Sequence, residues 1–286
     1  MPAPVNKLKQ ALADGKQTIG CWLVLGDSYA AEIAASAGFD WCVIDNEHAP
    51  NDLRSTLAQL QALSQTPNQT SVSAVVRPPI GETHILKQFL DIGCQSFVVP
   101  MIESAAQAAE LVRATRYPPG GVRGVGASTA RASNFNAYAD YLHTANDQIC
   151  LFVQVESRAG LAALPDILAV DGVDGVFIGP SDLSADLGHL GNPHAPAVVT
   201  AIDGALDAIA ASGKASGIFA VDPVDAERYL ARGVSFVAVA SDINSMTTAL
   251  RQTASRFRQY QPAETASRNS QQKQPATTSR CLIAQL

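Results

Sequence analysis

Short apolar runs alternate with longer amphipathic segments from residue 18 to residue 260. The runs are almost wholly nonpolar, as is typical of strands that are covered by helices on one face and packed against an interior on the other. The segments between them have the length and periodicity of helices. This pattern predicts repeated βα units that build a parallel sheet.

Eight units follow one another along the chain. The predicted strands cover residues 18–25, 41–47, 71–78, 96–102, 149–156, 175–180, 214–220 and 236–242. The predicted helices cover residues 29–37, 52–64, 84–92, 105–115, 161–170, 196–212, 223–232 and 245–260. Eight units in about 240 residues predict an α/β fold of the (β/α)8 TIM-barrel type. An open doubly wound sheet is the rival interpretation.

The chain divides by composition into a barrel and a tail. Residues 1–260 are predicted to form one catalytic barrel domain, whereas residues 261–286 are rich in Gln, Ser and Thr and are predicted to be disordered. A Pro- and Gly-rich excursion, 116–148, is interpreted as a flexible loop over the barrel mouth. Its glycines do not complete a GxGxxG motif, so a phosphate cradle is the weaker interpretation.

The net charge of −6 excludes neither a metal nor a small substrate, but it argues against nucleic acid and anionic membrane as partners. The sequence lacks an apolar leader and a run long enough to span a bilayer, so a cytoplasmic location is expected. The five cysteines include no CxxC pair, and four of them lie in or beside apolar runs. They are therefore interpreted as reduced, buried thiols.

Candidate chemistry comes from polar residues at the carboxyl ends of the predicted strands, where barrel enzymes place their active sites. This set consists of Asp45, Glu47, His48, Arg77, Gln154, Glu156, Ser181, Asp182, Ser241 and Asp242.

Two acids of this set follow neighbouring strands. Glu156 ends the fifth strand and Asp182 follows the sixth, so both carboxylates are expected at one edge of the sheet. Carboxylate ligands without Cys or His suggest a magnesium- or manganese-type site. Gln154 lies two residues before Glu156 and faces the same side. The alternative is that Gln154 and Glu156 are polar plugs inside the barrel.

His48 and Arg77 are the other candidates for catalysis. His48 lies just past the second strand, beside two acids that would raise its basicity. Arg77 precedes two prolines that hold the backbone extended, and it is placed to stabilise an enolate or a carboxylate. A surface ion pair is the alternative for Arg77.

Lysine positions exclude a Schiff-base mechanism. None of the six lysines lies at the carboxyl end of a predicted strand, where a carbonyl substrate would bind. Carbonyl activation is therefore expected from a metal ion.

The sequence resembles the HpcH/HpaI family of metal-dependent pyruvate aldolases over about residues 5–258. The resemblance is carried by Asp40-Trp41, by Ile44-Asp45-Asn46-Glu47-His48-Ala49-Pro50-Asn51, by Val76-Arg77-Pro78, by Arg116-Tyr117-Pro118-Pro119 with Arg123-Gly124-Val125-Gly126, by Val153-Gln154-Val155-Glu156, and by Phe177-Ile178-Gly179-Pro180-Ser181-Asp182-Leu183-Ser184. The sequence departs from the family pattern at Asn46 and Ser181, and neither change removes a functional group.

The resemblance implies a barrel of the phosphoenolpyruvate/pyruvate type, a homo-hexamer with the last helix exchanged between subunits, and a divalent cation (Mg²⁺, Mn²⁺ or Co²⁺). It also implies a role for each site residue: Glu156 and Asp182 as metal ligands; Gln154, Ser181 and Asp182 as substrate contacts; His48 as proton acceptor; Arg77 as transition-state stabiliser; and Asp91 as the acid that raises the basicity of His48. From its position alone, Asp91 is a surface residue at the end of a helix.

The implied activity is a reversible aldol cleavage. A 4-hydroxy-2-oxo acid, such as 4-hydroxy-2-oxoheptane-1,7-dioate from aromatic-compound catabolism, would yield pyruvate and an aldehyde through a metal-stabilised enolate. Decarboxylation of oxaloacetate, or another carbon–carbon bond formation from the same enolate, is the alternative. A barrel without catalytic activity is the remote alternative.

Overall fold

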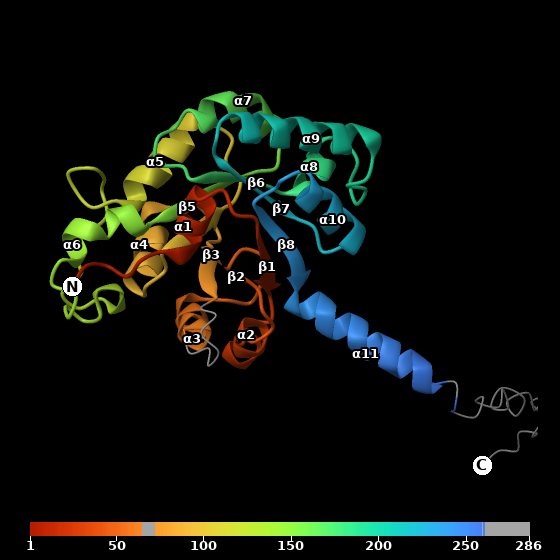
Figure 1. Cartoon of the computed structure of the whole chain (residues 1–286), viewed down its shortest axis with the longest axis horizontal. Coiled ribbons are helices and arrows are strands. Elements are labelled where there is room, and N and C mark those ends of the chain that lie inside the picture. Colours follow the sequence, from red (N-terminus) through yellow and green to blue (C-terminus); the bar gives the residue numbers. More distant parts are fainter. Residues whose placement is uncertain (65–71, 259, 261–286) are drawn as a thin grey trace, which may run out of the picture. The chain divides into compact units, whose positions relative to one another are not determined.

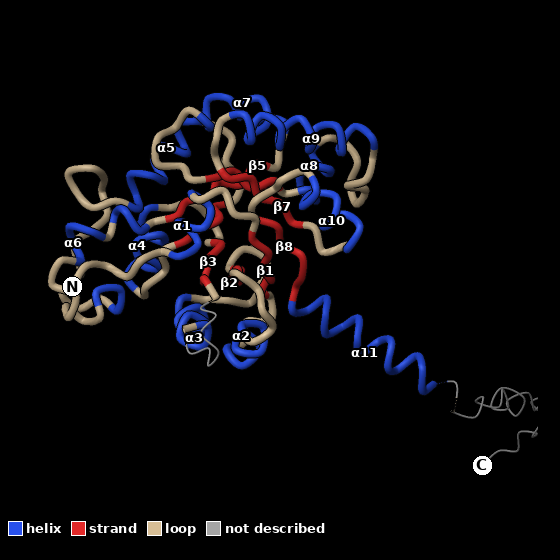
Figure 2. The backbone as a smooth tube through the Cα atoms, viewed as in Figure 1, coloured by secondary structure: helices blue, strands red, loops and turns tan. Residues whose placement is uncertain are grey.

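The computed structural model describes residues 1–64, 72–258 and 260. Eight parallel strands form a closed barrel in which each strand pairs with its neighbours in sequence and β8 pairs with β1. Figure 2 shows the strands gathered at the centre, with helices around them. The predicted TIM barrel is confirmed, and the open sheet is excluded.

Each predicted strand is present, most often with a shorter carboxyl end. The strands are β1 (Thr18–Leu23), β2 (Trp41–Asp45), β3 (Ser73–Arg77), β4 (Ser96–Val99), β5 (Cys150–Val155), β6 (Gly175–Ile178), β7 (Ala215–Phe219) and β8 (Phe236–Ser241).

A helix follows each strand as predicted, and three further α-helices are present. The α-helices are α1 (Lys7–Ala13), α2 (Ser28–Ala35), α3 (Leu53–Leu63), α4 (Thr83–Asp91), α5 (Ala105–Thr115), α6 (Tyr141–Thr144), α7 (Arg158–Leu168), α8 (Pro180–Asp186), α9 (Pro196–Ala211), α10 (Pro223–Ala231) and α11 (Asp242–Arg258) (Figure 1). The three helices α1, α6 and α8 lie outside the eight ranges predicted for helices. No helix of the described chain is both long and apolar enough to cross a lipid bilayer.

The chain divides into two compact units, residues 1–246 and residues 247–286. The first unit contains the barrel and the start of α11. The described part of the second unit is the remainder of α11, which buries none of its side chains, together with Tyr260. The predicted disordered tail lies outside the described residues, so that prediction and the domain boundary at residue 260 stay predictions.

Large aromatic side chains fill the barrel interior. The Trp41 ring of β2 stacks on Phe236 of β8, with 3.7 Å between ring centroids, and Phe152 of β5 stacks on the other side of Phe236 at 4.7 Å. These rings fit because the neighbouring strands present glycine at the same level. A Cβ on Gly20 would lie 2.1 Å from the Trp41 ring. The interior is therefore a packed layer, as is usual for this barrel.

Above this layer lie three more interior aromatics. The rings of Trp22 and Phe177 have centroids 5.5 Å apart, and Phe219 meets Trp22 edge to face at 5.4 Å. Strand side chains alternate between interior and helix-facing sides. The next inward positions beyond the aromatic layers are therefore the ends of the strands at the barrel mouth.

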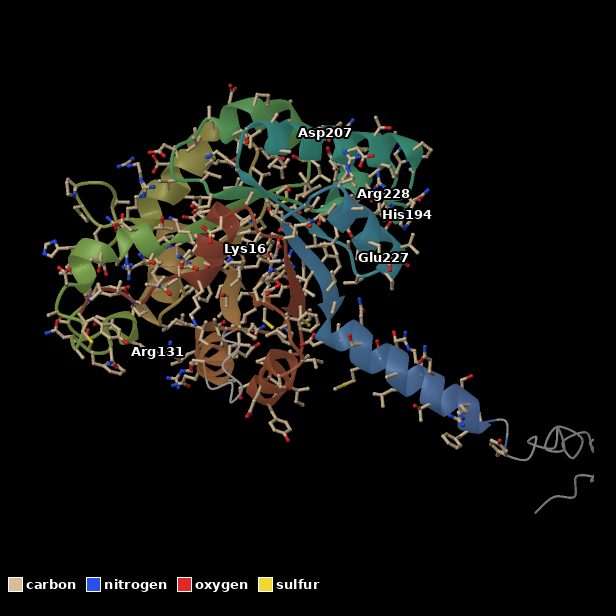
Figure 3. The ribbon with its side chains drawn as sticks, viewed as in Figure 1. Lys16, Arg131, His194, Asp207, Glu227 and Arg228 are labelled. Atoms are coloured by element: carbon tan, nitrogen blue, oxygen red, sulfur yellow. The ribbon has the colours of Figure 1, made fainter. Side chains whose placement is uncertain are left out.

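The excursion 116–148 was predicted over the barrel mouth, and that prediction is wrong. It connects the end of α5 to the start of β5, both of which lie at the amino end of the strands. Its Arg131, labelled in Figure 3, donates to the carbonyl of Ile92 just after α4. Thr144 of the excursion accepts from the backbone of Ala3. The amino-acid composition of a loop does not show which end of the barrel it covers, because loops connect strands and helices at both ends.

We predict that Gly20→Ala destabilises the barrel by about 1–3 kcal/mol, because the added methyl group would overlap the Trp41 ring in a packed interior. Urea denaturation followed by tryptophan fluorescence measures this change. Gly204→Ala is the matched control: Gly204 lies inside α9 with open space around it, so that substitution is expected to stabilise the protein by about 0.5–1 kcal/mol. Equal effects at the two positions would contradict the packing argument.

Candidate active site

The polar residues of the barrel mouth continue the inward-facing rows of the interior. Asp45 follows Trp41 and Val43 at every second position of β2, and Glu156 follows Phe152 and Gln154 along β5. Arg77 ends β3 directly opposite Asp45 in the register of the sheet. The site is thus the uppermost layer of the barrel interior, where polar side chains replace aromatic rings.

Asp45 and Arg77 border a cavity of about 270 Å³, and Glu156 lies beside its lining residues Gln154 and Gly179. Its walls combine the aromatic layer beneath with polar groups from several strand ends. The lining residues that bear on the chemistry are Trp22, Asp45, His48, Arg77, Gln154, Phe177, Ser181, Asp182 and Phe219.

Arg77 is held by a buried ion pair. Its Nε and Nη2 donate to the two carboxylate oxygens of Asp45 at 2.9 and 2.6 Å, a bidentate geometry. Its guanidinium carbon lies 4.9 Å from the Trp22 ring centroid. Burial alone would raise the pKa of Asp45, but the hydrogen bonds and charge of Arg77 lower it. The surface-pair interpretation of Arg77 is wrong, because both partners are buried.

Glu47 adds a second carboxylate beside Arg77. Its Oε2 lies 2.9 Å from Nη1 of Arg77, but outside hydrogen-bonding geometry, so this buried oxygen has no hydrogen-bond partner. Burial raises the pKa of Glu47 against the lowering effect of Arg77, and the charges of Asp45 and Asp182 act in the same direction as burial. Of the five N–H groups of Arg77, two donate to Asp45, and three remain for a ligand.

His48 lies at the rim of the cavity with a largely exposed imidazole. Its Nε2 is 3.8 Å from Oε2 of Glu47, and its backbone N–H donates to Asp45. The Asp45 carboxylate therefore fixes both Arg77 and the loop that carries His48. An exposed imidazole next to a carboxylate can accept a proton from a ligand in the cavity.

Glu156 is buried, and both of its carboxylate oxygens accept hydrogen bonds. The backbone N–H of Met101 donates to Oε1 at 2.9 Å, and the Gln154 side chain donates to Oε2. Burial raises the pKa of Glu156, and the charges of Asp182 and Glu47 add to that rise. The described chain offers Glu156 no basic partner, so its negative charge is left uncompensated.

Asp182 and Ser181 come from the first turn of α8, next to Glu156. The start of α8 approaches so closely that a Cβ on Gly179 would lie 2.4 Å from Oε2 of Glu156. Glycine at this position is therefore what allows the helix start and the buried carboxylate to meet. Sequence reasoning missed Gly179 because its role depends on contact between neighbouring strands.

The donor set at this edge fits a divalent cation. Glu156 and Asp182 offer carboxylate oxygens, and the buried Oε1 of Gln154 has no hydrogen-bond partner. These are the hard oxygen ligands that magnesium and manganese prefer. Among the residues that the structure describes, no group of three or more His, Cys, Asp or Glu is arranged to hold a metal. Two carboxylates would therefore need substrate and water oxygens to complete the coordination.

The structure separates Asp91 from the rest of the candidate set. Asp91 ends α4 at the amino end of the barrel, and its Oδ1 lies 3.4 Å from Nη2 of the buried Arg123. His48 follows β2 at the opposite, carboxyl end. Within one chain the two side chains cannot meet, because the packed interior lies between them.

Asp242 and Ser241, the remaining candidates, lie at the end of β8. The carboxylate of Asp242 accepts from the backbone N–H groups of Val24 and Leu25 after β1. This bridge ties the last strand to the first where the barrel closes, which is a structural role. Ser241 is buried in the cavity wall.

Comparisons with known proteins match most of the chain to one family. The model of the HpcH/HpaI aldolase/citrate lyase family matches residues 18–249. A hydroxypyruvate/pyruvate aldolase from Pseudomonas aeruginosa is 55% identical over 93% of this chain and 98% of its own length. A 4-hydroxy-2-oxo-heptane-1,7-dioate aldolase from Shigella boydii is 52% identical over 88% of this chain and 95% of its own length.

A solved structure shares the fold along almost the same span. The HpcH/HpaI aldolase/citrate lyase family protein from Burkholderia cenocepacia is 42% identical, with a TM-score of 0.85 over 89% of this chain and all of that one. The residues of the candidate site lie within the span that the family model matches.

We predict that Asp45→Asn lowers the free energy of unfolding at pH 7 by about 3 kcal/mol, because it leaves the buried Arg77 without its bidentate partner. The pKa of Asp45 is lowered in the folded state. The difference in unfolding free energy between the wild type and Asp45→Asn should therefore be complete above the pKa of an Asp in the unfolded chain. It should disappear as the pH falls through the lower pKa of Asp45 in the folded protein. Urea denaturation across this pH range measures the difference.

Asp14→Asn is the control for this measurement. Asp14 is exposed and lies 3.6 Å from Lys16 in a surface pair. Its substitution should change stability by less than about 0.5 kcal/mol at any pH. An Asp45 variant with the same small effect would show that the ion pair does not stabilise the barrel.

Proposed function

The chain belongs to the HpcH/HpaI aldolase/citrate lyase family, and on that premise we propose that it is a carbon–carbon lyase that reversibly cleaves 4-hydroxy-2-oxo acids to pyruvate and an aldehyde. The observation that carries the proposal is the convergence of Asp182 and the unpartnered oxygen of Gln154 in one cavity with Arg77 and His48. Glu156 lies directly behind the cavity wall, against Gln154 and Gly179. Glu156, Asp182 and Gln154 supply oxygen ligands for a metal ion. Arg77 supplies a positive charge and His48 supplies a base, and both are within reach of the same small substrate.

The 2-oxo acid end of the substrate would bind at the acidic edge. A divalent cation held by Glu156 and Asp182 would polarise the 2-oxo group, stabilise the charge left on C3 and so lower the barrier to breaking the C3–C4 bond. Gln154 and Ser181 would contact the substrate from the two sides of this edge. We propose Mg²⁺, Mn²⁺ or Co²⁺ as the cation, because all three accept these oxygen ligands.

Proton transfer is assigned to His48. In the cleavage direction, His48 accepts the proton of the C4 hydroxyl while the C3–C4 bond breaks, which leaves an aldehyde and the pyruvate carbanion equivalent. The imidazolium that forms lies close to Glu47, whose Oε2 is 3.8 Å from Nε2. Transfer of this proton from the imidazolium to C3 then releases pyruvate and returns His48 to its neutral form. In the reverse direction the same group returns the proton to the new hydroxyl.

Arg77 would stabilise the negative charge that develops on the substrate oxygen. Its remaining N–H groups face a cavity with an aromatic floor, where a hydrogen bond to a charged oxygen is stronger than in water. The Asp45 pair and the Trp22 ring hold the guanidinium in place before the substrate arrives. Little reorganisation is then needed as the charge develops.

Asp91 can act on His48 only from another subunit, because the two residues lie at opposite ends of their own barrel. We propose a homo-oligomer, a hexamer by resemblance to the family, in which Asp91 of one subunit approaches His48 of its neighbour. We also propose a cytoplasmic location, which the free, buried thiols of the four described cysteines support.

We predict that the protein releases pyruvate from 4-hydroxy-2-oxo acids and that EDTA stops the reaction until a divalent cation is returned. Glu156→Ala should abolish the response to the cation, because one of the two carboxylate ligands is gone. A coupled lactate dehydrogenase assay measures pyruvate, and circular dichroism checks the fold. Ser212→Ala, at the end of α9 far from the mouth, is the control.

Two outcomes would contradict this assignment. Activity that neither EDTA nor Glu156→Ala affects would remove the metal from the reaction. Faster pyruvate release from oxaloacetate than from any 4-hydroxy-2-oxo acid would favour a decarboxylase that uses the same site.

We predict that His48→Ala and Asp91→Ala each slow cleavage, His48→Ala by about 10²-fold or more, as is usual for loss of a general base. If Asp91 acts across an interface, mixing the two inactive variants and reassembling them should restore part of the activity, because some sites then receive one intact His48 and one intact Asp91. The restored rate measures the effect. Mixing His48→Ala with Arg77→Ala, both at the same mouth, is the control and should restore nothing.

Inactive mixtures of His48→Ala and Asp91→Ala, formed from subunits shown to have exchanged, would refute the interfacial role of Asp91. Full activity of Asp91→Ala alone would remove Asp91 from the mechanism altogether.

A further inference from the structure

Met101 has a backbone conformation that its side chain disfavours. It lies two residues after β4 with φ of +59°, in the left-handed region. In the described chain, three other non-glycine residues share this feature, and all three belong to one turn of the amino-end excursion, Asn134, Phe135 and Asn136. Such strain persists only where the surroundings enforce it, and it is common at functional sites.

The strained residue aims its backbone N–H at the buried carboxylate of Glu156. The N–H of Met101 donates to Oε1 of Glu156 at 2.9 Å. Met101 is 53% exposed, and its hydrogen bond to the carboxylate comes from its backbone and not from its side chain. The left-handed conformation therefore orients the N–H group toward Glu156, and the side chain takes no part in this contact.

The rest of the β4–α5 loop is fixed along the end of β5. The N–H of Ile102 donates to the carbonyl of Gln154 at 3.0 Å, and Glu103 accepts from the Ser157 hydroxyl at 2.6 Å. These two contacts hold the residues after Met101 in register with β5. Met101 therefore makes the turn that connects the end of β4 to this fixed segment.

The opposite side of the carboxylate is equally confined. The Gln154 side chain donates to Oε2 of Glu156, and the start of α8 leaves no space for a Cβ at Gly179. One oxygen is thus set by Met101 and the other by Gln154, so the plane of the carboxylate is fixed. A carboxylate that is oriented before a cation arrives binds it more tightly, and loss of such a supporting contact typically costs 10–100-fold in affinity.

We propose that Met101 is a positioning residue, whose left-handed backbone directs an N–H group to Glu156 and so sets this carboxylate for divalent-cation binding. The inference rests on the proposed role of Glu156 as a metal ligand. It assigns the effect to the backbone of Met101 and none to its thioether.

A series of substitutions at Met101 tests this proposal, because the substituted residues differ in how readily they adopt the left-handed conformation. Met101→Leu keeps the preference of the wild type, Met101→Gly adopts the conformation without strain, and Met101→Val strongly disfavours it. Mn²⁺ is the probe. Isothermal titration calorimetry on the metal-free protein gives its affinity, and thermal unfolding of the same metal-free samples gives stability.

We expect Met101→Val to bind Mn²⁺ about 10–100-fold more weakly than the wild type. Met101→Leu should bind like the wild type. Met101→Gly should bind at least as tightly and unfold at a higher temperature, because the strain is relieved and the N–H keeps its place. Asn134→Val is the matched control: Asn134 has φ of +50° at the other end of the barrel, so this substitution should lower stability without changing Mn²⁺ affinity.

Three results would overturn the inference. The first is wild-type Mn²⁺ affinity in a folded Met101→Val variant, which would leave Met101 with a structural role only. The second is weakened binding in Met101→Gly, which decides the matter even if Met101→Val does not fold. The third is weakened binding in Met101→Leu, which would assign the effect to the side chain. Absence of Mn²⁺ binding in the wild type is a different result, because it overturns the proposed metal site itself and the inference with it.

Discussion

The bidentate ion pair between Asp45 and Arg77 connects the barrel interior to its mouth. It joins the ends of β2 and β3, lies against the ring of Trp22, and also holds the backbone of the loop that carries His48. Burying two charges is costly unless the geometry is good and their remaining hydrogen-bonding groups are used. Here the pair occurs at the one level of the interior where aromatic packing ends. Arg77, the loop that carries His48 and the Trp22 ring beneath them are therefore all connected through this one ion pair.

The acidic side of the cavity has the opposite electrostatic character. Glu156 is buried and Glu47 is half-buried near Asp182, and the pKa values of both glutamates are raised in consequence. Arg77, which Asp45 already neutralises, and His48 when protonated supply positive charge next to Glu47. An arrangement of this kind opposes folding unless a positive charge joins it. The same unfavourable charge would favour a divalent cation in the proposed metal site.

Much of the fold and part of the site could be predicted from sequence, since both depend on patterns along the chain. Apolar runs and helix-length segments located eight strands, and polar residues at the strand ends located Arg77, Glu156 and Asp182. Contacts between residues that are distant in sequence produce no pattern of apolar and polar positions along the chain. The fit of Gly179 against Glu156, the ring of Trp22 under Arg77 and the conformation of Met101 all belong to this second class. The excursion was placed at the wrong end because loop composition does not record which end of a barrel a loop covers.

The pairing of glycine with aromatic rings inside the barrel has a consequence for how this interior can change over evolutionary time. The Trp41 ring occupies the space that a side chain at position 20 would need. A change at either position alone creates a clash or a void, so viable changes must come in pairs. The interior should therefore diverge slowly and in correlated steps, while the loops at the mouth remain free to vary one residue at a time.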